Sequence, residues 1–116
     1  MAEYKQYITQ VQENGNVMIS EDVVATIVAH AVAEVEGIEA LSTKTDLINK
    51  SKGKGMKILI AEDNSLSIDC NVIIKYGQSV IDVANAVQQA VTNAVESMTA
   101  VKVNVVNINV CGIARQ

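Results

Sequence analysis

The sequence LSIDCNVIIKY, residues 66–76, decides the fold, because every second side chain from its first residue onward is apolar. A period of two is typical of a β-strand with one buried face. Gly77 permits a sharp change of direction, and Ser79 with Asp82 forms an S-x-x-D helix start. An apolar stripe with helical spacing follows, and strand rhythm returns at 101–105. The stripe comprises Val80, Ala84, Val87, Val91, Ala94, Val95 and Met98. We therefore expect a β-α-β unit with parallel strands.

The apolar residues of the last strand change parity near Val105 and Val106. Val103 and Val105 share one parity, whereas Val106, Ile108 and Val110 share the other. Without an extra residue, the second set would point to the wrong side of the sheet. The sequence therefore predicts a β-bulge near Val105–Val106, with all five side chains mainly buried.

Composition indicates one domain with an unusual core. The chain has 116 residues, contains no Phe, Trp or Pro, and obtains its core volume from 18 Val and 13 Ile. The formal net charge of −4 argues against nucleic acid as a partner. The two cysteines, Cys70 and Cys111, are interpreted as small packing residues.

The sequence also predicts where the protein resides. No apolar run approaches the roughly 18 residues that cross a bilayer, and the polar start MAEYK lacks a signal-peptide core. We therefore expect a cytoplasmic protein that contacts the membrane only peripherally, at its inner face and through a partner.

The N-terminal half predicts a hairpin followed by a helix. A weak strand at 7–11 precedes the turn signal Asn14-Gly15, and residues 17–19 would pair back on it. Ser20 is a good N-cap, and Gly37 is expected to end the helix at its C′ position. The predicted buried face of this helix comprises Val23, Val24, Ile27, Val28, Ala31, Val32 and Val35.

These elements predict an α+β fold. We expect a two-layer sandwich with a mixed β-sheet and two long helices packed on one face, in the order β-α-(β)-β-β-α-β. Residues 1–14 form an N-terminal segment, with an edge strand as an alternative. Residues 15–116 form a single domain with a flexible basic loop at 42–55.

Three groups of residues are candidate contact sites. One is a row of amides on the second helix, a second is a row of small residues on the first helix, and the third is a basic patch that would touch anionic lipid or an acidic partner. The amide row is Asn85, Gln89 and Asn93, the row of small residues is Ala25, Ala29 and Ala33, and the basic patch is Lys50, Lys52 and Lys54. The alternatives are a solvated polar face, alanines that serve only as helix formers, and a loop without a partner.

Catalysis would require convergent reactive groups. The candidates are His30, Asp69, Cys70 and Cys111, yet Asp69 and Cys70 are adjacent in a strand and point to opposite faces. His30 has no Cys, Asp or second His at ligand spacing. We therefore expect no enzyme, no cofactor and no metal site.

Five short motifs carry a resemblance to a known family. They are EVEGI at 34–38, GMKI at 55–58, YG at 76–77, VQ at 87–88 and VNINVCGI at 106–113. In this order they resemble the alkaline shock protein family, the envelope stress response proteins of Gram-positive bacteria, over residues 15–114. The resemblance implies a non-catalytic protein that self-associates, as a homo-oligomer, or is recruited by a membrane-anchored protein partner.

The expected function is therefore that of an adaptor or scaffold in protein–protein interaction, linked to cell-envelope (alkaline) stress. The alternative is a carrier for a small ligand or lipid, which needs an apolar pocket. The sequence does not separate a pocket from a well-packed Val/Ile core.

Overall fold

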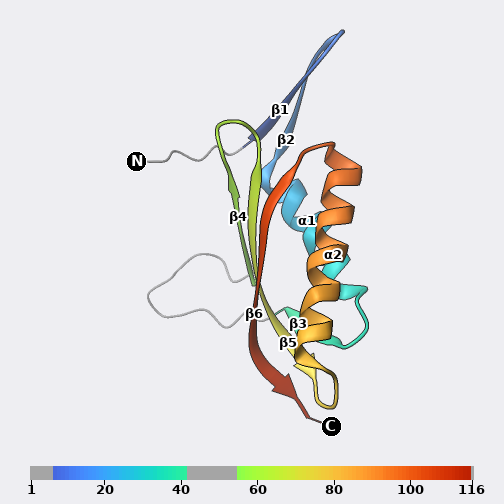
Figure 1. Ribbon diagram of the computed structural model, residues 1–116. Helices are drawn as coiled ribbons and strands as arrows, with labels where there is room; N and C mark the ends of the chain where they lie inside the picture. The colour runs from blue at the N-terminus through green and yellow to red at the C-terminus, as the bar shows by residue number, and fades with distance from the viewer. Residues whose placement is uncertain (1–6, 42–54, 116) are drawn as a thin grey trace.

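The computed structural model describes residues 7–41 and 55–115, which form two helices and six strands (Figure 1). In chain order these are β1 (Tyr7–Gln12), β2 (Gly15–Ser20), α1 (Glu21–Ala33), β3 (Ile38–Leu41), β4 (Met56–Ile60), β5 (Leu66–Lys75), α2 (Val80–Thr99) and β6 (Val103–Ala114). Both helices lie on the same side of the main sheet. The predicted α+β fold with a mixed sheet and helices on one face is confirmed.

β5 is the central strand of the main sheet. On one side it pairs antiparallel with β4 through residues 66–70 and with β3 through residues 72–74. On its other side it pairs in parallel with β6 along its whole length, as expected for a β-α-β unit. Its burial alternates as predicted, and the side chains of Leu66, Ile68, Cys70, Val72 and Ile74 are all 0% exposed.

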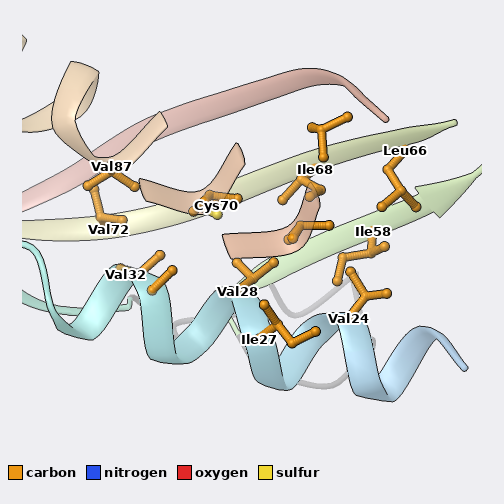
Figure 2. Packing of buried hydrophobic residues seen from close by; sticks show 14 of the residues in the cluster. Val24, Ile27, Val28, Val32, Ile58, Leu66, Ile68, Cys70, Val72 and Val87 are labelled. Carbon is orange, nitrogen blue, oxygen red and sulfur yellow. The ribbon is translucent and has the colours of Figure 1, made fainter. Parts of the chain in front are cut away.

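The core lies between the helices and the covered face of the sheet (Figure 2). Val24, Val28 and Val32 of α1 point toward the apolar residues of β4 and β5, and Val87 of α2 packs above Val72. Most of these side chains are β-branched, so they have little rotamer freedom to lose on burial, and they favour strands over helices. Tertiary packing rather than intrinsic propensity therefore stabilises the two helices.

β6 departs from the prediction. Its register on β5 shifts twice, leaving Asn104 and Cys111 as extra residues, so the first bulge lies just before Val105. The expected burial of all five apolar residues is wrong: Val103 is buried and Val106 and Ile108 are half-buried, but Val105 is 42% exposed and Val110 is 36% exposed. Val105 lies beside Ser67 on the uncovered face, because the bulge comes before it rather than after it.

The first helix begins where the sequence predicted and ends earlier. The hydroxyl oxygen of Ser20 accepts a hydrogen bond from the backbone N–H of Val23 (3.3 Å). The helix ends at Ala33, four residues before Gly37, and a tighter turn joins the backbone N–H of Val35 to the carbonyl of Val32. Val23 is 48% exposed and Val35 only half-buried, so their predicted burial is wrong.

The second helix has a narrower buried stripe than the sequence predicted. Val83, Val87, Val91, Val95 and Thr99 are buried at a strict spacing of four residues. Val80 and Met98, expected inside, are exposed. The Thr99 hydroxyl donates to the carbonyl of Val95 (2.7 Å) and accepts from the N–H of Val101 (3.2 Å), which satisfies its polar atom in the core.

The predicted hairpin is present and forms a sheet of its own. β1 and β2 pair antiparallel about a two-residue turn at Glu13-Asn14, one residue before the predicted Asn14-Gly15, and project beyond the main sheet (Figure 1). The fully buried side chain of Ile8 and two hydrogen bonds attach the hairpin to the domain. Gln10 donates to the carbonyl of Thr99 (3.1 Å), and Asn64 donates to the carbonyl of Thr9 (3.1 Å).

Candidate binding surfaces

The predicted amide row lies on the outer side of α2. Asn85, Gln89 and Asn93 are all exposed, and their spacing of four residues places them opposite the buried valine stripe. Within the described part of the chain, none of the three amides hydrogen-bonds to another residue, whereas nearby Gln88 does. The three side chains therefore keep both donors and acceptors available to a partner.

The predicted alanine row lies apart from the amides. Ala25 and Ala29 are half-buried and Ala33 is exposed, and Ala25 also packs against the core. A groove runs between α1 and α2, lined on the α1 side by Ala31, Glu34 and Val35, and on the α2 side by Ala90, Asn93, Ala94 and Ser97. The structure thus brings Asn93 next to the end of α1 but keeps the alanine row out of this groove.

The uncovered face of the sheet carries two polar pairs that the sequence analysis missed. Asn107 of β6 donates to the Asp69 carboxylate of β5 (2.8 Å), and Asn109 donates to the side-chain oxygen of Asn71 (3.0 Å). These residues sit opposite one another in the parallel register. A shallow surface depression adjoins the second pair, lined by Glu39, Asn71, Ile73, Cys111, Gly112, Ile113 and Ala114.

The edge of β6 is partly capped by α2. The Glu96 carboxylate accepts a hydrogen bond from the backbone N–H of Val103 (3.0 Å), and Gln88 donates to the carbonyl of Val106 (3.0 Å). Both side chains reach from the helix to main-chain groups of the strand. The N-terminal half of β6 therefore presents fewer unpaired groups to a neighbour than its C-terminal half.

The candidate reactive residues do not converge. Cys70 is buried in the core, whereas Asp69 points to the uncovered face; His30 is exposed on α1 and Cys111 is exposed on β6. Burial, and then the neighbouring Asp69 charge, raise the pKa of the Cys70 thiol to about 12, which keeps it protonated and unreactive. Residues 7–41 and 55–115 contain no group of three or more His, Cys, Asp or Glu side chains placed to hold a metal ion.

Two predictions concern the membrane. Lys50, Lys52 and Lys54 lie outside the described residues, so the anionic-contact loop stays a prediction. Neither described helix combines the length and the apolar character needed to cross a bilayer.

The polar pairs and edge caps follow from a register that sequence periodicity does not reveal. Asn104, Asn107 and Asn109 are visible in the last strand, as are Asp69 and Asn71 in the earlier one. Their pairing depends on the extra residue that the first bulge inserts before Val105. Without that residue, Asp69 would lie opposite Val106 and Asn71 opposite Ile108. The asparagine spacing was the available signal, but it did not determine the pairing.

Comparison with known proteins supports the family expectation. The model of the alkaline shock protein 23 family, described as having a cell envelope-related function, matches residues 9–115. The uncharacterized protein Spy1535 of Streptococcus pyogenes serotype M6 is 37% identical over 88% of this chain and 81% of its own length. The uncharacterized protein YqhY of Bacillus subtilis is 30% identical, over 85% of this chain and 77% of its own length.

Solved structures resemble the fold without close sequence similarity. One MamM-CTD variant superposes with a TM-score of 0.53 at 10% identity, covering 82% of this chain and 93% of that one. A second MamM-CTD variant gives 0.51 at 12% identity, covering 82% and 96%. These likenesses concern the fold alone, whereas the family match spans nearly the whole chain. The chain therefore belongs to the alkaline shock protein 23 family, whose function is related to the cell envelope.

Proposed function

We propose that the protein is an adaptor or scaffold that acts at the cell envelope by binding, through self-association or by recruitment to a membrane-anchored protein. The observation that carries the proposal is the exposed amide row on α2. Asn85, Gln89 and Asn93 share one side of the helix and form no hydrogen bonds within the described chain. Such groups cost less to desolvate than full charges and can pair with either donors or acceptors, which suits a reversible contact.

Two other features support a binding role. The groove between α1 and α2 begins beside Asn93, so an approaching partner would meet amides and small side chains together. Exposed apolar residues also lie on α2: Ile81 is 67% exposed and Met98 is 69% exposed. Ile81 precedes Asn85 by four residues, so it lies on the amide side of α2 and adds an exposed apolar side chain to that surface.

The test is a triple charge substitution in the amide row. Asn85→Lys, Gln89→Lys and Asn93→Lys together should leave the fold intact, because exposed substitutions usually change stability by no more than about 0.5 kcal/mol each. The added charge should weaken partner docking or self-association. A pull-down from a Gram-positive lysate with membranes retained, together with size-exclusion chromatography and light scattering, measures both.

The matched control places the same three charges on the β1–β2 hairpin. Gln12, Asn16 and Met18 are exposed there, and their substitution by Lys should leave both readouts unchanged. Equal retention of partners and assembly by both triple variants would contradict a role for the amide row. Recovery of a bound metabolite instead of a protein would favour the carrier alternative.

A further inference from the structure

The outer edge of β6 can be assigned residue by residue from the ladder it forms with β5. The N–H of Leu66 donates to the carbonyl of Lys102 (3.2 Å), and the N–H of Tyr76 donates to that of Ala114 (2.8 Å). The backbone N–H and C=O groups of the even-numbered residues of β5 therefore point toward β6. The backbone groups of the odd-numbered residues point to the opposite side, where β3 and β4 lie. There the N–H of Asn71 donates to the carbonyl of Gly55 (2.8 Å), and the N–H of Lys75 donates to the carbonyl of Gly37 (2.8 Å).

This parity determines which residues of β6 have free backbone groups. In a parallel pair, a residue bonds to the two residues flanking its partner. Cys70 is opposite Ile108 and Val72 is opposite Val110, so their bonds go to residues 107, 109 and 111. The N–H and C=O groups of Val106, Ile108 and Val110 therefore point away from the sheet.

α2 caps only the N-terminal part of this edge. The Glu96 carboxylate accepts a hydrogen bond from the N–H of Val103, and the Gln88 amide donates one to the carbonyl of Val106. No described residue bonds the outward groups of Ile108 and Val110, and the nearby side chains of Val110 and Ile113 are 36% and 43% exposed. An open strand edge with apolar side chains is a template for adding another strand.

We propose that a second copy of this chain adds to this edge, antiparallel, about a two-fold axis at Asn109. This inference goes beyond the proposed function, because it gives self-association a register and a surface separate from the amide row, which then remains for a membrane-anchored partner. Ile108 of each copy would pair with Val110 of the other, and each pair would exchange two N–H···O bonds. Moving the axis by one residue toward the N-terminus would bring in Val106, whose carbonyl Gln88 already occupies, so the Asn109 register uses the uncapped groups.

The side chains on both faces of the edge are complementary to a second copy. Residues 103–114 carry no charged side chain, so two copies with a net charge of −4 each can meet here without placing like charges in contact. On the uncovered face, Asn109 would lie opposite the Asn109 of the second copy, which extends the Asn71–Asn109 pair into a continuous row. An amide both donates and accepts, so it pairs with its own copy. On the helix side, Ile108 and Val110 would cover one another.

Disulfide trapping tests the register. Across the open edge, residues 109 would form a non-hydrogen-bonded pair with a Cα···Cα distance of about 4.5 Å, within the range that a disulfide spans. In a Cys111→Ser background, Asn109→Cys should give a disulfide-linked dimer on treatment with diamide. Asn107→Cys in the same background should stay monomeric, because residues 107 of the two copies would lie four residues apart along the strand. Restoring Cys111 beside Asn107→Cys should bring cross-linking back, since residues 107 and 111 face each other in this register.

The two variants that lack Cys111 are matched, because each removes one polar pair on the uncovered face and leaves buried Cys70 as the only other thiol. Circular dichroism checks that each variant is folded. Equal cross-linking of the two single variants, or none with Asn109→Cys, would overturn the inference. Trapping can fail while light scattering still reports an assembled parent or the pull-down still recovers a partner. That outcome would contradict the β6 register and leave the proposed function intact.

Discussion

β5 and β6 are neighbours in one sheet and are both rich in Val and Ile, yet their side chains are buried to very different extents. The five core-facing residues of β5 are all 0% exposed. In β6, Val103 is 9% exposed, and exposure rises to 36% at Val110 and 43% at Ile113. β5 is paired on both sides, whereas β6 is paired on one side and interrupted by two bulges. Apolar alternation therefore reports which face a residue occupies, while burial depends on the neighbours that cover it.

The largest expected difference between the two strands is in packing energy. Ile68 is fully buried on β5, and Ile68→Ala should lower the free energy of unfolding by about 4 kcal/mol, as a large-to-small change in a core does. Ile108 on β6 is half-buried, so Ile108→Ala should cost only about 1–2 kcal/mol. Urea unfolding of both variants measures the difference, and equal costs would mean that β6 is as well packed as β5.

A second contrast is in thiol chemistry. Burial, and then the Asp69 charge, raise the pKa of Cys70 on β5 from 9.0 to about 12, so its thiolate at pH 8 is roughly a thousandfold rarer than that of an unshifted thiol. Cys111 on β6 is exposed. Folded protein should therefore release one equivalent of chromophore from Ellman's reagent at pH 8, and a second only after unfolding. Rapid reaction of both thiols in the folded parent, and of Cys70 in folded Cys111→Ser, would show that the β5 core opens readily.

The same shift has a defined pH dependence. The folded state favours the protonated thiol of Cys70, so this contribution to stability is fully present below pH 9 and is lost as the pH rises toward 12. Across that window, the parent should lose stability more steeply than Cys70→Ala, measured by urea unfolding at each pH. Parallel curves would rule out a burial-raised pKa at Cys70.

Sequence periodicity predicted the parts of the fold that rest on local patterns. The alternation at 66–76, the Ser79 helix start and the Asn14-Gly15 turn each gave an element that the structure contains. Burial at the ends of elements was predicted less well: Val23, Val80 and Met98 have apolar spacing but lie beyond the cover of neighbouring elements. The bulge was predicted from a parity change, but its position one residue earlier reversed the expected placement of Val105.

The candidate surfaces divide in the same way. The exposure of Asn85, Gln89 and Asn93 followed from helical spacing relative to the valine stripe. The pairs Asp69–Asn107 and Asn71–Asn109, and the caps from Gln88 and Glu96, join segments brought together only by the sheet register. A sequence pattern places a residue on a face of its own element, and the tertiary register then selects its partner.

Hydrogen exchange of individual β6 amides most directly tests the central claim that this strand is bonded along one edge only. The N–H groups of Asn107 and Asn109 point to β5, whereas those of Ile108 and Val110 point outward. At a concentration where light scattering gives the monomer mass, the first two should exchange slowly and the last two rapidly, since within residues 7–41 and 55–115 only the first two are hydrogen-bonded. Slow exchange at all four amides of the monomer, or rapid exchange at all four, would contradict the account.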